Sequence, residues 1–319
     1  MAQKNSIDCI PLLNWKDIEE KEALKDRWLY RGETISNGNK EKFSTKTISF
    51  DELNENSNLM TSFDKLFKGI KVYSKRQRTE MPIIERALVS EFKRRFHQYS
   101  KYIPRDNYNL EWLSLMRHYE APTRLLDWTY SFYIALYFAL EHHQESDYVV
   151  WAIDMDWVIE KARNLICSRY GSEAAKILVD KVSFSLKFNQ VFKKAFLNQG
   201  DEIAFVYLAC PSRLTERMTV QKGVFLCQGN IKKSFLENLC AMEGWKGAIK
   251  GYVIEHEMKH EFLNRLYDMN ITRTSLFPGL DGFAKSLSVF HHIFRTKTKN
   301  TGGRPYEEWK NSKVIWEEI

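Results

Sequence analysis

Residues 118–143 read HYEAPTRLLDWTYSFYIALYFALEHH, a polar segment followed by a strongly apolar one. The apolar part predicts a buried helix over about residues 131–143. The polar part places Arg124 and Asp127 three positions apart, separated by two leucines. A buried arginine keeps its charge, so it needs an acid, backbone carbonyls or a bound anion as its partner. The two residues therefore either form an internal clamp or face a pocket.

Other polar residues of this stretch are also candidates for a site. Asp127, Thr129 and Ser131 precede the predicted helix, where each could cap free backbone amides. His118 is the nearby side chain that titrates close to neutral pH, so it is the candidate for proton transfer. A single histidine after an amphipathic helix is also a common structural residue, and both interpretations stay open.

The composition of the chain bounds its class. Its 319 residues fit one large domain or two small ones, and 44% hydrophobic with 28% charged residues is ordinary for a globular protein. A net charge of +7 permits a polyanionic partner without requiring one. Five scattered cysteines, with no CxxC pair, predict neither a disulfide framework nor a cysteine-rich zinc site. We expect a cytoplasmic chain without membrane contact, since no leader is visible and the longest apolar run is short.

Helices and strands alternate irregularly along the predicted fold. Pro82 predicts a helix start, and Gly32 predicts a turn directly after a short strand. Without a strict βαβ alternation, the expected class is α+β: one large mixed domain with small central strands surrounded by helices. The predicted helices cover about residues 12–27, 82–100, 109–119, 131–143, 156–198, 233–242, 256–269 and 281–294, and the strands 28–30, 148–153, 203–210, 218–227 and 248–255.

Three further segments suggest partners or ligands. Residues 65–78 (KLFKGIKVYSKRQR) are the most basic window and contain no acid, which fits a solvated loop or lid, or contact with nucleic acid. The tail, residues 296–319, begins as a linker and ends with two tryptophans that could dock on a protein partner. His256, Glu257 and His260 match the zinc pattern HExxH, but His256 directly follows a predicted strand and no third ligand is evident. We therefore expect no metal.

Four motifs resemble those of the FRG-domain family, which is named for its Phe/Tyr-Arg-Gly motif. They are YRGE at 30–33, WLSLMRHYEAPTRLLDWTYSFYIALYFA at 112–139, RMTVQKGVF at 217–225 and SLFPGLDGFAKSL at 275–287. Their order and spacing are similar to those of the family over about residues 28–290. The resemblance implies an FRG domain at 28–295, between an N-terminal helical lead-in at 1–27 and the linker and aromatic tail at 296–319.

The family arrangement is similar to ADP-ribosyltransferase-type folds, which implies a pocket for NAD or another nucleotide. In such a pocket Arg31 would bind the pyrophosphate or ribose, residues 123–131 would form the middle element, and Gln221 would take the third-strand position. The implied catalytic residues are Asp127, His118 and Gln221, and the implied substrate-binding residues are Arg31, Gly32, Thr123, Arg124, Thr129 and Ser131.

The sequence departs from the family pattern at positions that matter for chemistry. Arg117 replaces a Gln of the pattern and Glu120 replaces a Gly. The predicted strand at 218–227 has Gln221 where active transferases of that fold carry a Glu, so Asp127 or Glu33 would have to supply the carboxylate.

Three functions follow from the sequence. The first is an intracellular effector, such as a toxin or an anti-phage defence protein, with an NAD-cleaving or ADP-ribosyltransferase-like activity. The second is a non-catalytic module that binds a nucleotide or nucleic acid. The third is a scaffold in which the central motif is a core clamp.

Overall fold

The computed structural model describes residues 6–20, 27–35, 47–49, 59–67, 75–141, 147–179, 185–197 and 203–287. The chain divides into two compact units, Met1–His260 and Glu261–Ile319, and each is described by itself.

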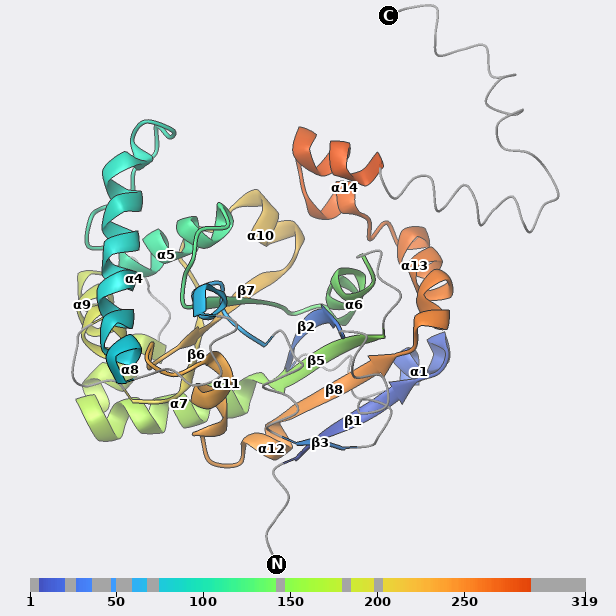
Figure 1. Cartoon of the computed structure of the whole chain (residues 1–319), viewed down its shortest axis with the longest axis horizontal. Helices are drawn as coiled ribbons and strands as arrows, with labels where there is room; N and C mark the ends of the chain where they lie inside the picture. The colour runs from blue at the N-terminus through green and yellow to red at the C-terminus, as the bar shows by residue number, and fades with distance from the viewer. Residues whose placement is uncertain are drawn as a thin grey trace, which may run out of the picture. The chain divides into compact units, whose positions relative to one another are not determined.

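An eight-stranded sheet organises the described part of the first unit (Figure 1). Its strand order is β3-β1-β8-β5-β2-β4-β7-β6, and the pair β1–β8 is parallel while the other neighbours are antiparallel. This mixture of helices and a largely antiparallel sheet confirms the α+β class, although the sheet is more extensive than the small central strands expected. The strands are β1 (Ser6–Leu12), β2 (Trp28–Thr34), β3 (Thr47–Ser49), β4 (Leu125–Thr129), β5 (Tyr148–Asp154), β6 (Val206–Ala209), β7 (Gly223–Gln228) and β8 (Ile249–Ile254).

The sheet is nearly divided between β2 and β4. Strand β2 pairs with β5 from Trp28 to Thr34, and β4 pairs with β7 from Leu125 to Thr129. Between β2 and β4, however, the register contains a single pair, Tyr30↔Thr129. We call this junction the seam. It joins a five-strand group (β3, β1, β8, β5, β2) to a three-strand group (β4, β7, β6).

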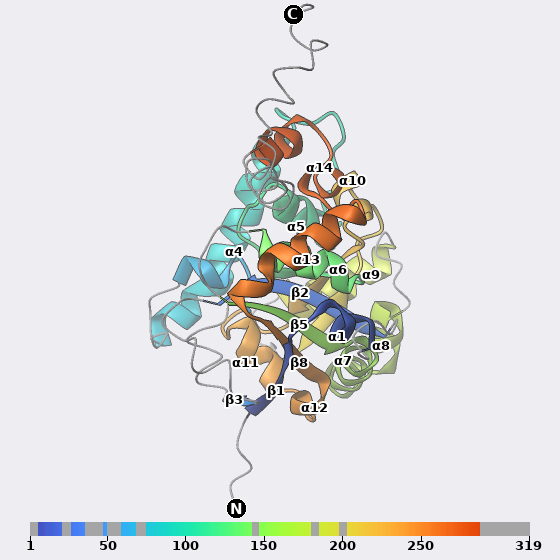
Figure 2. The same cartoon turned by 90° about the vertical axis from the view of Figure 1, so that its right-hand side faces the viewer.

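Helices cover both faces of the sheet in the first unit. Figures 1 and 2 both show α6 above the sheet and α7 below it. The helices of this unit are α1 (Trp15–Glu20), α4 (Lys75–Phe96), α5 (Asn109–His118), α6 (Phe132–Leu140), α7 (Met155–Tyr170), α8 (Ser172–Val179), α9 (Leu186–Phe192), α10 (Glu216–Val220), α11 (Phe235–Cys240) and α12 (Trp245–Ala248), with 3-10 helices at Asp64–Phe67 and His256–Met258 and a π-helix at Lys193–Leu197.

Gly32 lets α6 lie directly on β2. A Cβ atom at this position would stand 1.8 Å from the carbonyl oxygen of Ala135, a distance that no side chain tolerates. Tyr30, two residues earlier on the same face of the strand, packs edge-on against Phe132 of α6. The predicted turn at Gly32 is therefore wrong: the strand continues to Thr34, and the glycine serves close packing.

The largest hydrophobic core lies against the other face of the sheet. Leu29 and Trp151 of the sheet are fully buried there together with Val158 and Ile166 of α7 and Phe192 of α9. Because consecutive strand residues point to opposite faces, Leu29, Arg31 and Glu33 share this second face. The side chain of Arg31 thus extends from the edge of this apolar core toward the seam.

Three further sequence predictions differ from the structure. Helix α4 begins at Lys75, so Pro82 lies inside it instead of at its start. Residues 218–227 are not one strand, because α10 ends at Val220 and β7 begins at Gly223. Residues 6–12, expected in the helical lead-in, form β1, which pairs with β8.

The second unit is helical in its described part. Helix α13 runs from Lys259, at the end of the first unit, to Asp268, and α14 covers Arg273–Leu276. The side chains of Thr272 and Ser275 cap α14 reciprocally. Residues 280–287 form one more helix, whereas 288–294 of the helix predicted at 281–294, and the predicted tail at 296–319, lie outside the described residues.

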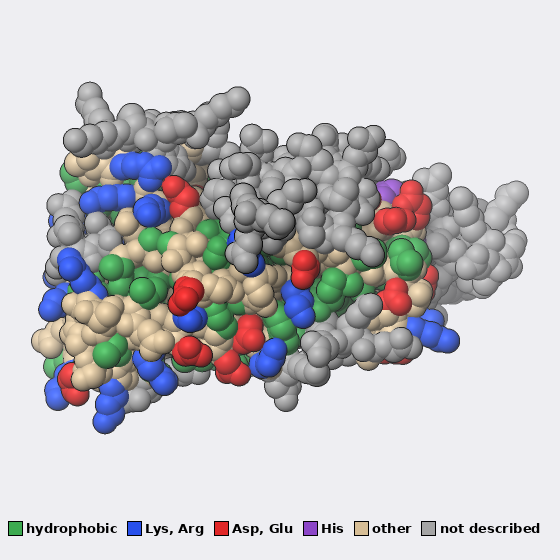
Figure 3. All heavy atoms as spheres, turned by 90° about the horizontal axis from the view of Figure 1, so that it is seen from below, with side chains coloured by type: hydrophobic (Ala, Val, Ile, Leu, Met, Phe, Trp, Pro, Cys, Tyr) green, Lys and Arg blue, Asp and Glu red, His purple; other side chains and the backbone are tan. Residues whose placement is uncertain are grey.

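One face of the described part of the molecule is chemically mixed. Figure 3 shows basic, acidic and apolar side chains in close alternation over the centre of the face seen from below. Within the described residues, no helix combines the length and apolar character needed to cross a bilayer.

Candidate functional site

Arg31 extends a guanidinium group across the seam. Its Nε donates to Glu33 Oε1 at 2.9 Å, and its Nη1 donates to the backbone oxygen of Asp127 on β4 at 2.8 Å. The side chain is 16% exposed. Among the described residues, Nη2 has no hydrogen-bond partner, so one edge of the group can still donate to a ligand.

Asp127, whose backbone oxygen Arg31 contacts, carries a partly exposed carboxylate. Its side chain is 45% exposed and accepts a hydrogen bond from Arg117 Nε at 2.6 Å. Arg117 lies in the last turn of α5, so three elements (β2, β4 and α5) meet at this point. The expected partnership of Arg124 with Asp127 does not form, because Asp127 pairs with Arg117 instead.

Arg124 is a clamp inside the fold. It is 1% exposed, and its guanidinium forms a two-point ion pair with Glu85 of α4, with the Nε to Oε1 distance at 2.6 Å. Its Nη1 also donates to the carbonyls of Gln228 and Gly229. These partners tie α4, β4 and β7 together, so Arg124 lacks the exposure that a phosphate-binding arginine needs.

Thr123 and Thr129 also serve the fold in this structure. Thr123 is buried, and its amide donates to the hydroxyl oxygen of Ser62 at 3.0 Å. Thr129 donates its hydroxyl to the carbonyl of Gln221 at 2.7 Å and accepts from the amide of Ser131 at 3.0 Å. Both threonines therefore form these hydrogen bonds with other residues of the protein.

Ser131 and Gln221 occupy helix ends. Ser131 is the N-cap of α6, where its hydroxyl accepts from the amide of Ile134, as the capping hypothesis predicted. Gln221 is the C-cap of α10, two residues before β7 begins, so it does not stand on the strand where the resemblance placed it.

His118 is half-buried at the end of α5. Burial lowers the pKa of His118, and the positive charge of Arg217 lowers that pKa further. The imidazole is therefore neutral at physiological pH and able to accept a proton. Its ring packs edge-on against that of Tyr119, and it follows Arg117 directly in the last turn of α5.

Glu120 does not enter the site. It is exposed and has a φ of 62°, the left-handed conformation that favours glycine. The amide of Ala121 bonds back to the carbonyl of Met116 at 2.8 Å, as in a helix end closed by a left-handed residue. A glycine, which the family pattern has at this position, adopts this backbone conformation without strain.

Two other candidate features are the HEMKH motif and the basic segment 65–78. His256 belongs to a 3-10 helix while His260 lies in α13, so the HEMKH residues do not share one regular helical face. Among the residues that the structure describes, no three His, Cys, Asp or Glu side chains lie close enough together to hold a metal ion. The basic segment 65–78 is described only in part, and its Arg78 donates to the carbonyl of Lys232 at 2.6 Å.

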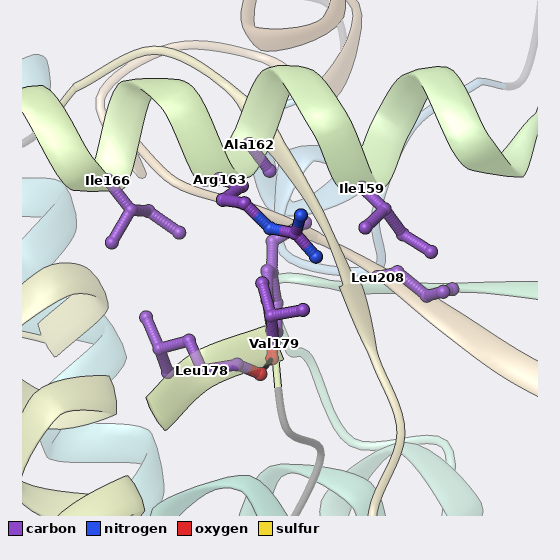
Figure 4. A pocket seen from close by; sticks show the side chains of 8 residues that line it. Ile159, Ala162, Arg163, Ile166, Leu178, Val179 and Leu208 are labelled. Atoms are coloured by element: carbon purple, nitrogen blue, oxygen red, sulfur yellow. Dashed lines mark hydrogen bonds between the residues drawn. The ribbon is translucent and has the colours of Figure 1, made fainter. Parts of the chain in front are cut away.

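Two cavities lie elsewhere in the first unit. A groove of about 320 Å³ runs between α4 and the turn after α5, and its lining is almost wholly apolar, with the rings of Phe92, Phe96 and Tyr99. A cavity of about 20 Å³ lies where Ile159, Ala162, Arg163 and Ile166 of α7 face Leu178, Val179, Tyr207 and Leu208 (Figure 4). Neither cavity is lined by Arg31 or Asp127, and the smaller one holds no more than a water molecule.

The residues that sequence reasoning missed are the hydrogen-bond and ion-pair partners of the predicted site residues. Glu85 and Trp151 carry no motif, and Arg117 was noted only as a departure from the family pattern. Their contacts join residues distant in the chain, such as Glu85 and Arg124, which are 39 positions apart. The one local signal was Glu33, which follows the Arg-Gly pair directly and lies on the same face of β2 as Arg31.

The fold and the site together define an α+β protein with two arginine–carboxylate pairs where two groups of strands meet. Residues 26–148 match the family model described as the FRG domain, and this match supports the FRG-domain family. The matched stretch contains both strands of the seam and α5, so it includes Arg31, Glu33, Arg117 and Asp127. No curated protein matches the chain, and no solved structure matches it.

Proposed function

We propose that the seam between β2 and β4 binds a nucleotide, with NAD as the first candidate. The observation that carries this proposal is the free Nη2 edge of Arg31 at the seam, together with the half-exposed carboxylate of Asp127, the residue whose backbone oxygen Arg31 contacts. A guanidinium suits phosphate oxygens, and a carboxylate suits the hydroxyl groups of a ribose. A nucleotide carries both groups next to each other.

Charge balance favours a ligand that is recognised by hydrogen-bond geometry. Glu33 faces Arg31 and Asp127 faces Arg117, so the formal charges of the four groups cancel. A site of this kind does not attract polyanions by an excess of positive charge. It selects a ligand that offers an acceptor to Arg31 and a donor to Asp127, as a nucleoside phosphate does.

We extend the proposal to cleavage of NAD in an ADP-ribosyltransferase-like arrangement. In that reaction the bond between ribose C1′ and the nicotinamide nitrogen breaks, and its electron pair leaves with nicotinamide. Asp127 is the exposed acid that could stabilise the resulting oxocarbenium-like ribose. An acceptor hydroxyl or water then bonds to C1′, and its proton passes to solvent or to neutral His118.

The wider role in this proposal is that of an effector acting in the cytoplasm, as a toxin or in anti-phage defence. It rests on the FRG-domain match alone and on no feature of the site, because a fold hosts many functions.

The test is incubation of the purified chain with NAD, following nicotinamide release by mass spectrometry and NAD binding by calorimetry. Arg31→Lys and Asp127→Asn are the site variants, and Glu173→Gln, on the exposed side of α8, is the matched control. We expect release from wild type and control and strong loss in both site variants. Binding without release would establish a non-catalytic nucleotide module, and absence of both would refute the proposed function.

A further inference from the structure

Glu33 is a carboxylate buried at the edge of the main core. Its side chain is 3% exposed, and both of its oxygens accept hydrogen bonds: Oε1 from Arg31 Nε at 2.9 Å and Oε2 from Trp151 Nε1 at 3.0 Å. Buried ion pairs contribute little net stability compared with apolar residues of the same volume. The fold alone therefore gives little reason for a carboxylate here.

Trp151 holds the Glu33 carboxylate from the core side. It is fully buried on β5 and stands opposite Arg31 in the β2–β5 register. Core packing holds its indole ring, and the ring's single donor points at Glu33. Trp151, Glu33 and Arg31 thus form a chain of hydrogen bonds that begins in the core and ends at the seam.

This chain of hydrogen bonds determines which edge of the Arg31 guanidinium can donate to a ligand. The guanidinium is planar and rigid, so fixing Nε on Glu33 and Nη1 on the Asp127 carbonyl also fixes the direction of Nη2. Glu33 itself is too buried to touch a ligand, so any influence it has on binding must act through Arg31.

We propose that Glu33 and Trp151 are positioning residues that aim the Nη2 edge of Arg31 at a phosphoryl oxygen of a nucleotide bound at the seam. This inference rests on the proposed function and names its recognition element: one oriented guanidinium edge supported from within the core.

The test is a double-mutant cycle on the affinity for ADP and NAD, measured by calorimetry on the full chain. Glu33→Gln keeps the size of the side chain but turns one acceptor into a donor that faces a donor. We expect Glu33→Gln to weaken binding by about tenfold or more in the wild-type background. In the Arg31→Lys background the same change should alter affinity less than about twofold, because the group it orients is absent.

Equal losses of affinity in the two backgrounds would show that Glu33 acts on the fold in general and would overturn the inference. If Glu33→Gln fails to fold, Trp151→Phe takes its place, because it removes the indole donor to Glu33. This change should weaken nucleotide binding more in the wild-type background than in the Arg31→Lys background. Glu173→Gln serves again as the control, with unchanged affinity expected.

A second readout does not need a ligand. The Nε–H signal of Arg31 in a ¹⁵N–¹H spectrum, assigned by its loss in Arg31→Lys, should exchange slowly with water in the wild type and rapidly in Glu33→Gln. Unchanged exchange would overturn the positioning role. If wild type binds neither ADP nor NAD, the proposed function fails; if wild type binds and Glu33→Gln binds equally well, only this inference fails.

Discussion

Replacing Arg124 by methionine tests whether this signature arginine holds the fold together or binds a ligand. The substitution keeps an unbranched side chain but leaves Glu85 buried without its counter-charge. It also removes the donor for the Gln228 and Gly229 carbonyls. Breaking a buried ion pair from one side costs about 3–5 kcal/mol, which is a large share of the roughly 5–15 kcal/mol that stabilises a domain.

The assay is urea denaturation followed by tryptophan fluorescence and far-UV circular dichroism. Removing both charges in Arg124→Met/Glu85→Leu should restore part of the lost free energy of unfolding. About 2 kcal/mol should stay lost, because both carbonyls lose the hydrogen bonds that the guanidinium donates. Arg94→Met is the matched control: Arg94 is 68% exposed and pairs with Glu91 on the surface of α4, so the urea midpoint should stay close to that of wild type.

The cost of Arg124→Met should also depend on pH. The uncompensated carboxylate of the variant can lose its charge by taking up a proton, so the difference from wild type should shrink as the pH falls toward about 5. A free energy of unfolding within about 1 kcal/mol of wild type would refute the clamp. If nucleotide binding were lost at the same time, Arg124 would belong among the ligand-binding residues after all.

Three further changes test the local geometry by thermal or urea unfolding. Gly32→Ala should destabilise the chain by about 3 kcal/mol or more, since the new methyl group would meet the carbonyl of Ala135; wild-type stability would contradict the close packing of α6 on β2. Glu120→Gly should stabilise it by about 1 kcal/mol by relieving the left-handed conformation, whereas Glu120→Ala should give no such gain, and an equal gain from both would point to another cause. Burial raises the pKa of Asp64 despite its backbone hydrogen bonds, so its stabilising contribution is complete below the unfolded pKa of about 3.9 and declines as the pH rises. Asp64→Asn should therefore gain stability relative to wild type as the pH rises above about 3.9, and a constant difference would show that Asp64 is not the titrating group.

The parts of the fold that the sequence predicted well are those with dense local patterns. The run YVVWAI predicted a strand at 148–153, and β5 covers Tyr148–Asp154. The helix predicted at 109–119 is α5, Asn109–His118. The apolar residues decide both structures: those of α5 recur with helical spacing, and those of β5 form a continuous run that is buried on both faces of the sheet.

The errors arise where a local signal has two meanings. Thr215 caps α10 by accepting from the amide of Met218, and a Thr followed by Glu216 is an N-terminal helix signal. In the sequence, the apolar residues of 218–227 favoured a strand, and this pattern led to the strand prediction despite the helix signal. Gly32 was similarly ambiguous, since a glycine allows either a turn or a close approach of two backbones.

The sequence indicated the residues of the candidate site that reach the seam, but it did not indicate which residues form ion pairs with one another. Arg31 and Asp127 were both selected from motifs, and the structure brings them together. The partner of Arg124 was not selected, because an arginine with two leucines beside it indicates burial but does not indicate which distant acid compensates it. Ion-pair partners are set by the packing of α4 on the sheet, which no local pattern specifies.

The seam also has a mechanical consequence. A sheet resists separation through the hydrogen bonds between its strands, and between β2 and β4 these reduce to one residue pair and the Arg31 contact with Asp127. Thermal opening of the sheet should therefore begin along this line, and the amides of Tyr30 and Thr129 should exchange with solvent earlier than those inside either strand group. A ligand that bridges Arg31 and Asp127 would cross-link the two groups, so occupancy of the site and rigidity of the whole sheet would rise together.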